Sequence, residues 1–137
     1  MLTTGQDLSV RYMNVSAPKY NFLMSQSKIA KKLNATGITM NDLKLSSIQD
    51  MACSITKEGL WDNMVTCHAD SRKAFTWNIK NKTLGQHTLV STSPGKGAVK
   101  AVAISVCGNF AVLGSQCGWI DVYNLQSGSH RGNCPSK

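Results

Sequence analysis

The chain has 137 residues, of which 42% are hydrophobic, and its 15 Lys and Arg against seven Asp and Glu give a net charge of +8. This length allows one ordinary domain with a buried core, and the composition does not indicate a membrane protein. The charge favours acidic partners such as RNA, but it identifies none of them, because proteins are basic for many reasons.

The first predicted element is a strand, a turn and a second strand over residues 2–15, with Gly5 and Asp7 between the two strands. A long insert follows, roughly residues 22–60, that is not strand-like throughout. Within it, residues 41–48 read as a linker that leads into a strand and residues 51–55 as a further apolar strand. We expect both strands to lie at the edge of a sheet.

The insert also contains a candidate nucleic-acid contact. Residues 27–33 can form one or two helical turns, with Lys28, Lys31 and Lys32 around an apolar pair. Loops on a rigid scaffold are common sites of recognition, and clustered lysines suit phosphate contacts. The alternative is a solvated basic loop, since a single basic turn is common on a basic protein.

Residues 64–79 predict a hairpin, with strands at 64–68 and 72–79 around a turn. Residues 99–124 predict a meander of three antiparallel strands, rich in β-branched, aromatic and small apolar residues. Gly108 and Gly118 fall at its two reversals, where glycine takes a positive φ at little cost. The three strands are expected at residues 99–104, 109–115 and 119–124.

The hairpin and the meander are copies of one repeat. Trp77-Asn78 in the hairpin matches Tyr123-Asn124 in the meander, 46 residues later, which is close to the roughly 40–45 residues of a WD-repeat blade. Met13-Asn14 marks a third, partial copy, so the chain starts inside a blade. A three-stranded sheet with two apolar faces is not stable alone and usually belongs to an array. The sequence therefore predicts an all-β fold, a WD-repeat β-propeller fragment of about two and a half blades; the alternative is an unrelated meander or sandwich with similar hairpins.

We expect one partial propeller over residues 1–137, built from blade portions and one insert. Its expected parts are the end of one blade at 1–21, the insert and edge strands at 22–60, a second blade portion at 61–98, a third at 99–132 and a truncated tail at 133–137. The expected structural repeat positions are Gly5, Asp7, Trp77, Asn78, Gly108, Gly118, Tyr123 and Asn124.

The signature residues of ideal blades are only partly present. Asn78 and Asn124 stand where an Asp would follow the aromatic residue, and Cys107 and Cys117 replace the Asp of two turns. These two turns lack a capping carboxylate. The Gly-His pair expected before Val99 is absent, so we expect the Asp-His-Ser/Thr-Trp hydrogen-bond network of ideal blades to be incomplete.

The sequence indicates no catalytic or metal site. Residues 93–97 lack the G-x-x-x-x-G-K-[ST] order of a phosphate loop, so a flexible loop is the better interpretation. None of His68, His87 and His130 has a local carboxylate or nucleophile in the pattern of a triad. The five cysteines include no Cys-x-x-Cys pair, so we expect reduced, mostly packed thiols and neither a metal nor a cofactor. We expect no enzymatic activity and no small-molecule substrate.

No targeting segment is apparent in the sequence. The N-terminus has no basic segment followed by an apolar core, and no apolar run approaches the roughly 20 residues that span a bilayer. We therefore expect a soluble, intracellular protein without a membrane partner.

Several runs are more specific than a generic blade. They are Trp61-Asp62-Asn63, Cys67-His68, Thr76-Trp77-Asn78, Cys107-Gly108-Asn109-Phe110-Ala111-Val112 and the run from Asp121 to Gly132. Over about residues 2–132 the chain resembles the family of WD-repeat subunits of the U3 small nucleolar ribonucleoprotein. The resemblance implies a non-catalytic scaffold in small-subunit processome assembly and pre-18S rRNA processing, in the nucleus and nucleolus. The implied partners are processome proteins, with U3 snoRNA or pre-rRNA as candidates.

The resemblance also implies more chain than is present. Members of the family resemble a tandem pair of propellers followed by a helical C-terminal domain, whereas residues 133–137 end where another blade would continue, so we expect a partial chain. The alternative function is a general WD-repeat adaptor that binds a peptide or a signalling protein without any RNA connection. Composition and periodicity do not separate the two functions; the family-specific runs favour the first.

Overall fold

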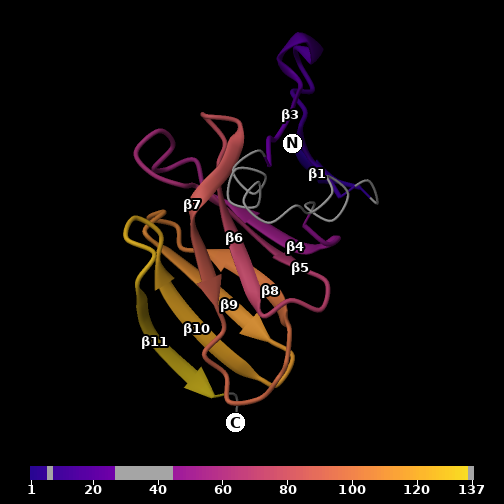
Figure 1. The fold of residues 1–137 in the computed structure, drawn as a ribbon. Coiled ribbons are helices and arrows are strands. Elements are labelled where there is room, and N and C mark those ends of the chain that lie inside the picture. Colours follow the sequence, from indigo (N-terminus) through magenta and orange to yellow (C-terminus); the bar gives the residue numbers. More distant parts are fainter. Residues whose placement is uncertain (6–7, 27–44, 136–137) are drawn as a thin grey trace, which may run out of the picture.

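Antiparallel strands dominate the structure, a computed structural model that describes residues 1–5, 8–26 and 45–135. The described residues form eleven strands in three separate sheets (Figure 1). The prediction of an all-β fold is confirmed.

The first sheet has three strands in the order β1-β2-β3. They are β1 (Leu2–Thr4), β2 (Val10–Tyr12) and β3 (Phe22–Leu23), with a short 3-10 helix, η1 (Pro18–Tyr20), between the last two. Tyr12 pairs with Phe22, and their rings stack with centroids 4.8 Å apart. The sheet therefore extends into the region that the sequence analysis assigns to the insert.

The second sheet is a complete four-stranded blade in the order β4-β5-β6-β7. Its strands are β4 (Ile48–Cys53), β5 (Met64–His68), β6 (Lys73–Asn78) and β7 (Thr83–Val90). The predicted hairpin is confirmed as β5 and β6. The two edge strands expected at the end of the insert are one strand, β4, which belongs to this blade. A bulge between Ile48 and Asp50 shifts its pairing with β5 and so breaks the alternation along the sequence.

The third sheet is a second four-stranded blade, in the order β11-β10-β9-β8. Its strands are β8 (Val99–Ile104), β9 (Phe110–Ser115), β10 (Trp119–Asn124) and β11 (His130–Pro135). The predicted meander is confirmed as β8 to β10, and Gly108 and Gly118 have φ angles of 73° and 74°. No sequence pattern predicted β11, which extends the blade to Pro135, past the expected boundary at residue 132.

The sheets pack face to face, with the second sheet between the other two. β8 packs against β4 and β5, and a buried cluster that includes Val65, Leu89 and Leu113 fills the space between the second and third sheets. A second buried cluster, with Val10 of β2 and Trp77 of β6, joins the first sheet to the second. Stacked sheets of this kind are the arrangement that propeller blades require.

Candidate functional site

The three lysines predicted to contact nucleic acid, Lys28, Lys31 and Lys32, lie outside the described residues, as does Asp7. Their roles stay predictions. Gly5 is described, and it lies exposed directly after β1.

A buried chain of hydrogen bonds crosses the second sheet at Trp77, which is fully buried. Its Nε1 donates to Thr66 Oγ1 over 2.8 Å, and Thr66 Oγ1 lies 2.9 Å from His68 Nε2. His68 Nδ1 lies 2.6 Å from the carbonyl oxygen of Ser46. Burial lowers the pKa of the His68 ring, which therefore carries its single proton on Nδ1, because a carbonyl only accepts. This series of hydrogen bonds therefore ends on the backbone carbonyl of Ser46, at the place where an ideal blade has an Asp side chain.

Asn78 and Asn124 perform the same task in the two complete blades. Asn78 ends β6 and its Oδ1 accepts a hydrogen bond from the backbone N–H of Asn81; Asn124 ends β10 and its Oδ1 accepts one from Ser127 N–H, both at 3.0 Å. Only a side-chain oxygen is needed to cap this turn, so Asn replaces the usual Asp at both positions.

Two serines cap the turns in which cysteine replaces Asp. Ser105 Oγ accepts from Phe110 N–H and Ser115 Oγ accepts from Trp119 N–H, both at 3.1 Å. The same hydroxyls bond to the thiols of Cys107 and Cys117 and lower the pKa of each. The expectation that most cysteines are packed is wrong. Cys67 alone is buried; the other four lie at turns or strand ends, where the side chain faces solvent.

Asp121 is a fully buried hydrogen-bond acceptor between the second and third sheets. Its carboxylate accepts from Ser91 Oγ at 3.0 Å, from Thr92 N–H at 3.1 Å and from Thr92 Oγ1, and lies 3.1 Å from His130 Nε2. Burial raises the pKa of this carboxyl, but the hydrogen bonds from Thr92, Ser91 and His130 outweigh burial, and the pKa lies below its usual value. Asp121 thus fixes the connection between two blades.

The Ser91, Asp121 and His130 side chains do not form a catalytic triad. In a triad the histidine lies between the other two and takes the proton of the serine. Here the carboxylate lies between Ser91 and His130, so His130 has no contact through which to activate the Ser91 hydroxyl. The arrangement holds the chain in place, and no local sequence pattern predicts it, because its three residues come from separate segments.

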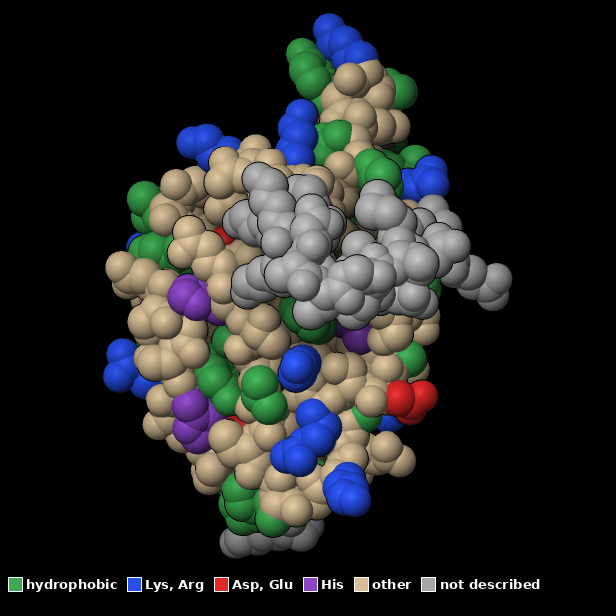
Figure 2. Space-filling view, in the orientation of Figure 1, with side chains coloured by type: hydrophobic (Ala, Val, Ile, Leu, Met, Phe, Trp, Pro, Cys, Tyr) green, Lys and Arg blue, Asp and Glu red, His purple; other side chains and the backbone are tan. Residues whose placement is uncertain are grey.

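The exterior is poorer in carboxylates than the composition suggests. Asp62 and Asp121 are buried, and Asp50 accepts hydrogen bonds from the backbone N–H groups of Met51 and Val102. Among the described acidic residues only Glu58 and Asp70 are exposed, whereas the exposed basic residues include Lys19, Lys73, Lys80, Lys82, Lys96 and Arg131. Blue side chains accordingly outnumber red ones on the face in Figure 2. This surface suits acidic partners.

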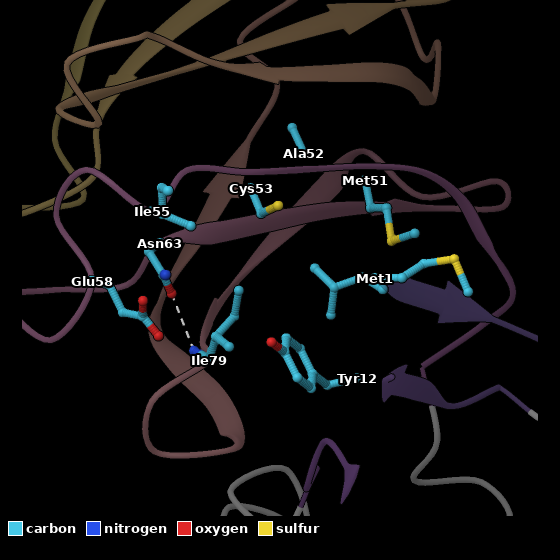
Figure 3. A pocket seen from close by; sticks show the side chains of 10 residues that line it. Met1, Tyr12, Met51, Ala52, Cys53, Ile55, Glu58, Asn63 and Ile79 are labelled. Atoms are coloured by element: carbon cyan, nitrogen blue, oxygen red, sulfur yellow. Dashed lines mark hydrogen bonds between the residues drawn. The ribbon is translucent and has the colours of Figure 1, made fainter. Parts of the chain in front are cut away.

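An apolar hollow of about 420 Å³ lies between the first and second sheets. Met1, Tyr12, Met51 and Ile79 point into it (Figure 3). Asn63 accepts from Ile79 N–H at 3.1 Å, while its buried Nδ2 has no partner among the described residues. The lining of the hollow is mainly apolar.

The described residues contain neither a metal-binding cluster nor a membrane-spanning helix. No three His, Cys, Asp or Glu side chains there come together as a set that could hold a metal ion. No helix in the same residues combines the length and the hydropathy needed to cross a membrane.

The chain is similar to known proteins along its whole length. Residues 1–137 match the family model described as the WDR36/Utp21 second beta-propeller domain. The chain is 39% identical over 96% of its length to the U3 small nucleolar RNA-associated protein 21 homolog of Schizosaccharomyces pombe, and 33% identical over 97% to the human WD repeat-containing protein 36. It is 35% identical over 93% to the U3 small nucleolar RNA-associated protein 21 of Saccharomyces cerevisiae.

These matches cover 14%, 15% and 14% of the respective relatives, so the chain spans about a seventh of their length. The predicted resemblance and the predicted WD-repeat propeller are both confirmed. With two complete blades and part of a third, the chain belongs to the WDR36/Utp21 family of β-propeller proteins.

Proposed function

We propose that this chain is part of a non-catalytic scaffold in small-subunit processome assembly and pre-18S rRNA processing, located in the nucleus and nucleolus. The observation that carries the proposal is the match of all 137 residues to one propeller family, two relatives of which are named for U3 small nucleolar RNA. The acid-poor exterior supports it, because rRNA-processing particles expose many phosphates. The polar contacts of the described blades serve packing and turn capping, as a scaffold requires.

The proposal is tested by depleting the full-length protein from cells and measuring both ribosomal RNAs. We expect mature 18S rRNA to fall and its precursors to accumulate, while the large-subunit rRNA is maintained. Expression of the full-length protein in the depleted cells should restore 18S rRNA. Unchanged 18S rRNA after depletion would favour a general WD-repeat adaptor without an RNA connection.

Direct RNA contact is a separate part of the proposal, and it concerns Lys28, Lys31 and Lys32. If these lysines contact phosphates, changing all three to Glu in the full-length protein weakens binding to purified RNA. The slope of affinity against salt concentration also flattens, because each phosphate contact releases counterions. Purified RNA is needed because a contact to an acidic protein is also salt-sensitive. If wild-type and triple-mutant proteins bind RNA with equal affinity across the salt series, these three lysines do not contact RNA.

A further inference from the structure

The three most exposed large aliphatic or aromatic side chains of the two complete blades lie in loops at one end of these blades. Val106 is 93% exposed, Ile55 81% and Leu60 69%. Ile55 and Leu60 belong to the β4–β5 loop, which is about twice as long as the β8–β9 loop that contains Val106. Figure 1 shows both loops projecting on the same side of the stacked blades.

Two hydrogen bonds join the two loops. Thr56 Oγ1 donates to the carbonyl oxygen of Val106, and Trp61 Nε1 donates to that of Gly108, both at 3.0 Å. Gly108 is buried with a positive φ, and a Cβ there would lie 3.0 Å from Lys57 Cγ. The two loops, together with Lys80 of the adjacent β6–β7 turn, form what we call the loop-end surface: Ile55, Lys57, Leu60, Lys80 and Val106.

Blade packing does not account for Leu60 and Val106, whereas Ile55 lines the hollow between the first and second sheets. In this structure neighbouring sheets bury side chains of their strand faces, as Val65, Leu89 and Leu113 do. A loop at the end of a blade projects beyond those faces, so a further blade stacked on the array leaves it exposed. Clustered exposed apolar residues on a rigid scaffold are typical of a protein-binding surface.

Two lysines lie beside the apolar side chains, and the stem of each contacts a glycine of the two loops. The stem of Lys57 packs on Gly108, and its Nζ lies 5.6 Å from the centre of the Trp61 ring. The stem of Lys80 packs on Gly59, where a Cβ would lie 3.1 Å from Lys80 Cδ. Neither lysine forms an ion pair with a described carboxylate. The same loop has two described acidic side chains: Glu58 is exposed and Asp62 is buried.

We propose that the loop-end surface binds an acidic, amphipathic segment of a partner protein. Apolar side chains of the segment would cover Leu60 and Val106, while its carboxylates pair with Lys57 and Lys80. Charge complementarity supports this occupant, because Lys57 and Lys80 present two ammonium groups that form no ion pair with a described carboxylate, beside the single exposed carboxylate of Glu58. Single-stranded RNA fits less well, since bases stack on aromatic rings, and the exposed side chains here are aliphatic.

This inference rests on the proposed scaffold function and is tested within the native assembly. A photoreactive benzophenone amino acid replaces Val106 in the full-length protein, the complex is irradiated and purified, and the crosslinked peptide is sequenced. A synthetic peptide of the captured sequence is then titrated against purified full-length protein. The variants are Lys57→Glu with Lys80→Glu and, as a matched control, Lys73→Glu with Lys96→Glu, which alter charge equally at the opposite end of the blades.

We expect the captured segment to combine acidic and aliphatic residues. Its peptide should bind at least about tenfold more weakly to the Lys57→Glu, Lys80→Glu protein, since two pairs are lost and two repulsions added, and unchanged to the control. The inference would be overturned by an adduct with RNA, with another part of the same chain or with a segment that lacks carboxylates, or by the absence of any adduct. Equal effects of the two double variants on peptide binding would also overturn it. U3 RNA in the same purified complex is measured separately. If U3 RNA is abundant but no adduct forms, the proposed role of the loop-end surface is rejected while the proposed scaffold function is retained.

Discussion

The indole nitrogen of Trp77 donates to the hydroxyl oxygen of Thr66 over 2.8 Å, inside a blade from which water is excluded. Thr66 in turn bonds to His68, so β5 and β6 are joined by three fully or almost fully buried polar side chains. A buried polar group is costly when its partner is removed. Each of these side chains therefore depends on the other two.

Replacing Trp77 tests this dependence. Trp77→Ala in the full-length protein should lower the free energy of unfolding by about 3–5 kcal/mol, because it opens a cavity between the first and second sheets. Trp77→Phe retains most of the apolar contact and removes the donor to Thr66, so its cost should be smaller, about 1–2 kcal/mol. Denaturant unfolding measures both. An unfolding midpoint of Trp77→Ala equal to that of the wild type would contradict the assigned register.

His68 predicts a dependence of stability on pH. Burial lowers its pKa below the ordinary value of 6.5. As the pH falls below about 6.5 the unfolded chain takes up a proton that the folded ring still refuses, so the free energy of unfolding decreases until the pH reaches the folded pKa. Above 6.5 the effect is absent. Urea unfolding of wild-type and His68→Gln proteins at pH 7.5 and 5.5 should show a smaller decrease in the variant; equal decreases would show that His68 is not the titrating group.

The space around Gly85 has no room for even one added methyl group. It lies on β7 against the buried side chains of Asp62 and Thr76, whose atoms occupy the space of a Cβ. Asp62 is held there by Thr76 Oγ1 at 2.6 Å and by Gln86 N–H at 2.7 Å. Gly85→Ala should therefore cost about 1–3 kcal/mol of stability. Gly132→Ala, with open space at its Cβ, is the control; equal losses in both variants would refute this packing.

The strands with strong local signals could be predicted from the sequence. β8, β9 and β10 are runs of β-branched and aromatic residues, and Gly108 and Gly118 mark the turns between them. β11 has no such signal, because five of its six residues are exposed and polar or small. It forms because the turn capped by Asn124 directs the chain back along β10. Edge strands of this kind are fixed by pairing, not by local pattern.

The polar contacts between segments could not be predicted. Asp121 gathers Ser91 and Thr92 from about 30 residues upstream and His130 from the following strand. These contacts depend on how the second and third sheets stack, which no local pattern encodes. The hydrogen bond from Trp61 in the β4–β5 loop to the carbonyl oxygen of Gly108 is equally non-local. The apolar residues of the β4–β5 and β8–β9 loops can be read from the sequence, but only the folded structure shows that they lie at the same end of the blades.

The open faces of the array predict poor solubility of residues 1–137 alone. The outer face of the third sheet presents Phe110, Val112, Ile120 and Val122, of which Phe110 and Ile120 are more than a third exposed. An isolated stack with a bare apolar face, and with one edge of β1 unpaired among the described residues, should self-associate. Size-exclusion chromatography should show oligomers or aggregate. A monomer that melts cooperatively would contradict this expectation.

The proposed function is tested most directly by purifying the endogenous full-length protein and measuring the RNA and the proteins that it retains. We expect strong enrichment of U3 small nucleolar RNA over other small nucleolar RNAs, together with processome subunits. A purified protein that retains neither U3 RNA nor processome subunits would contradict the proposed function and leave a propeller scaffold of another assembly.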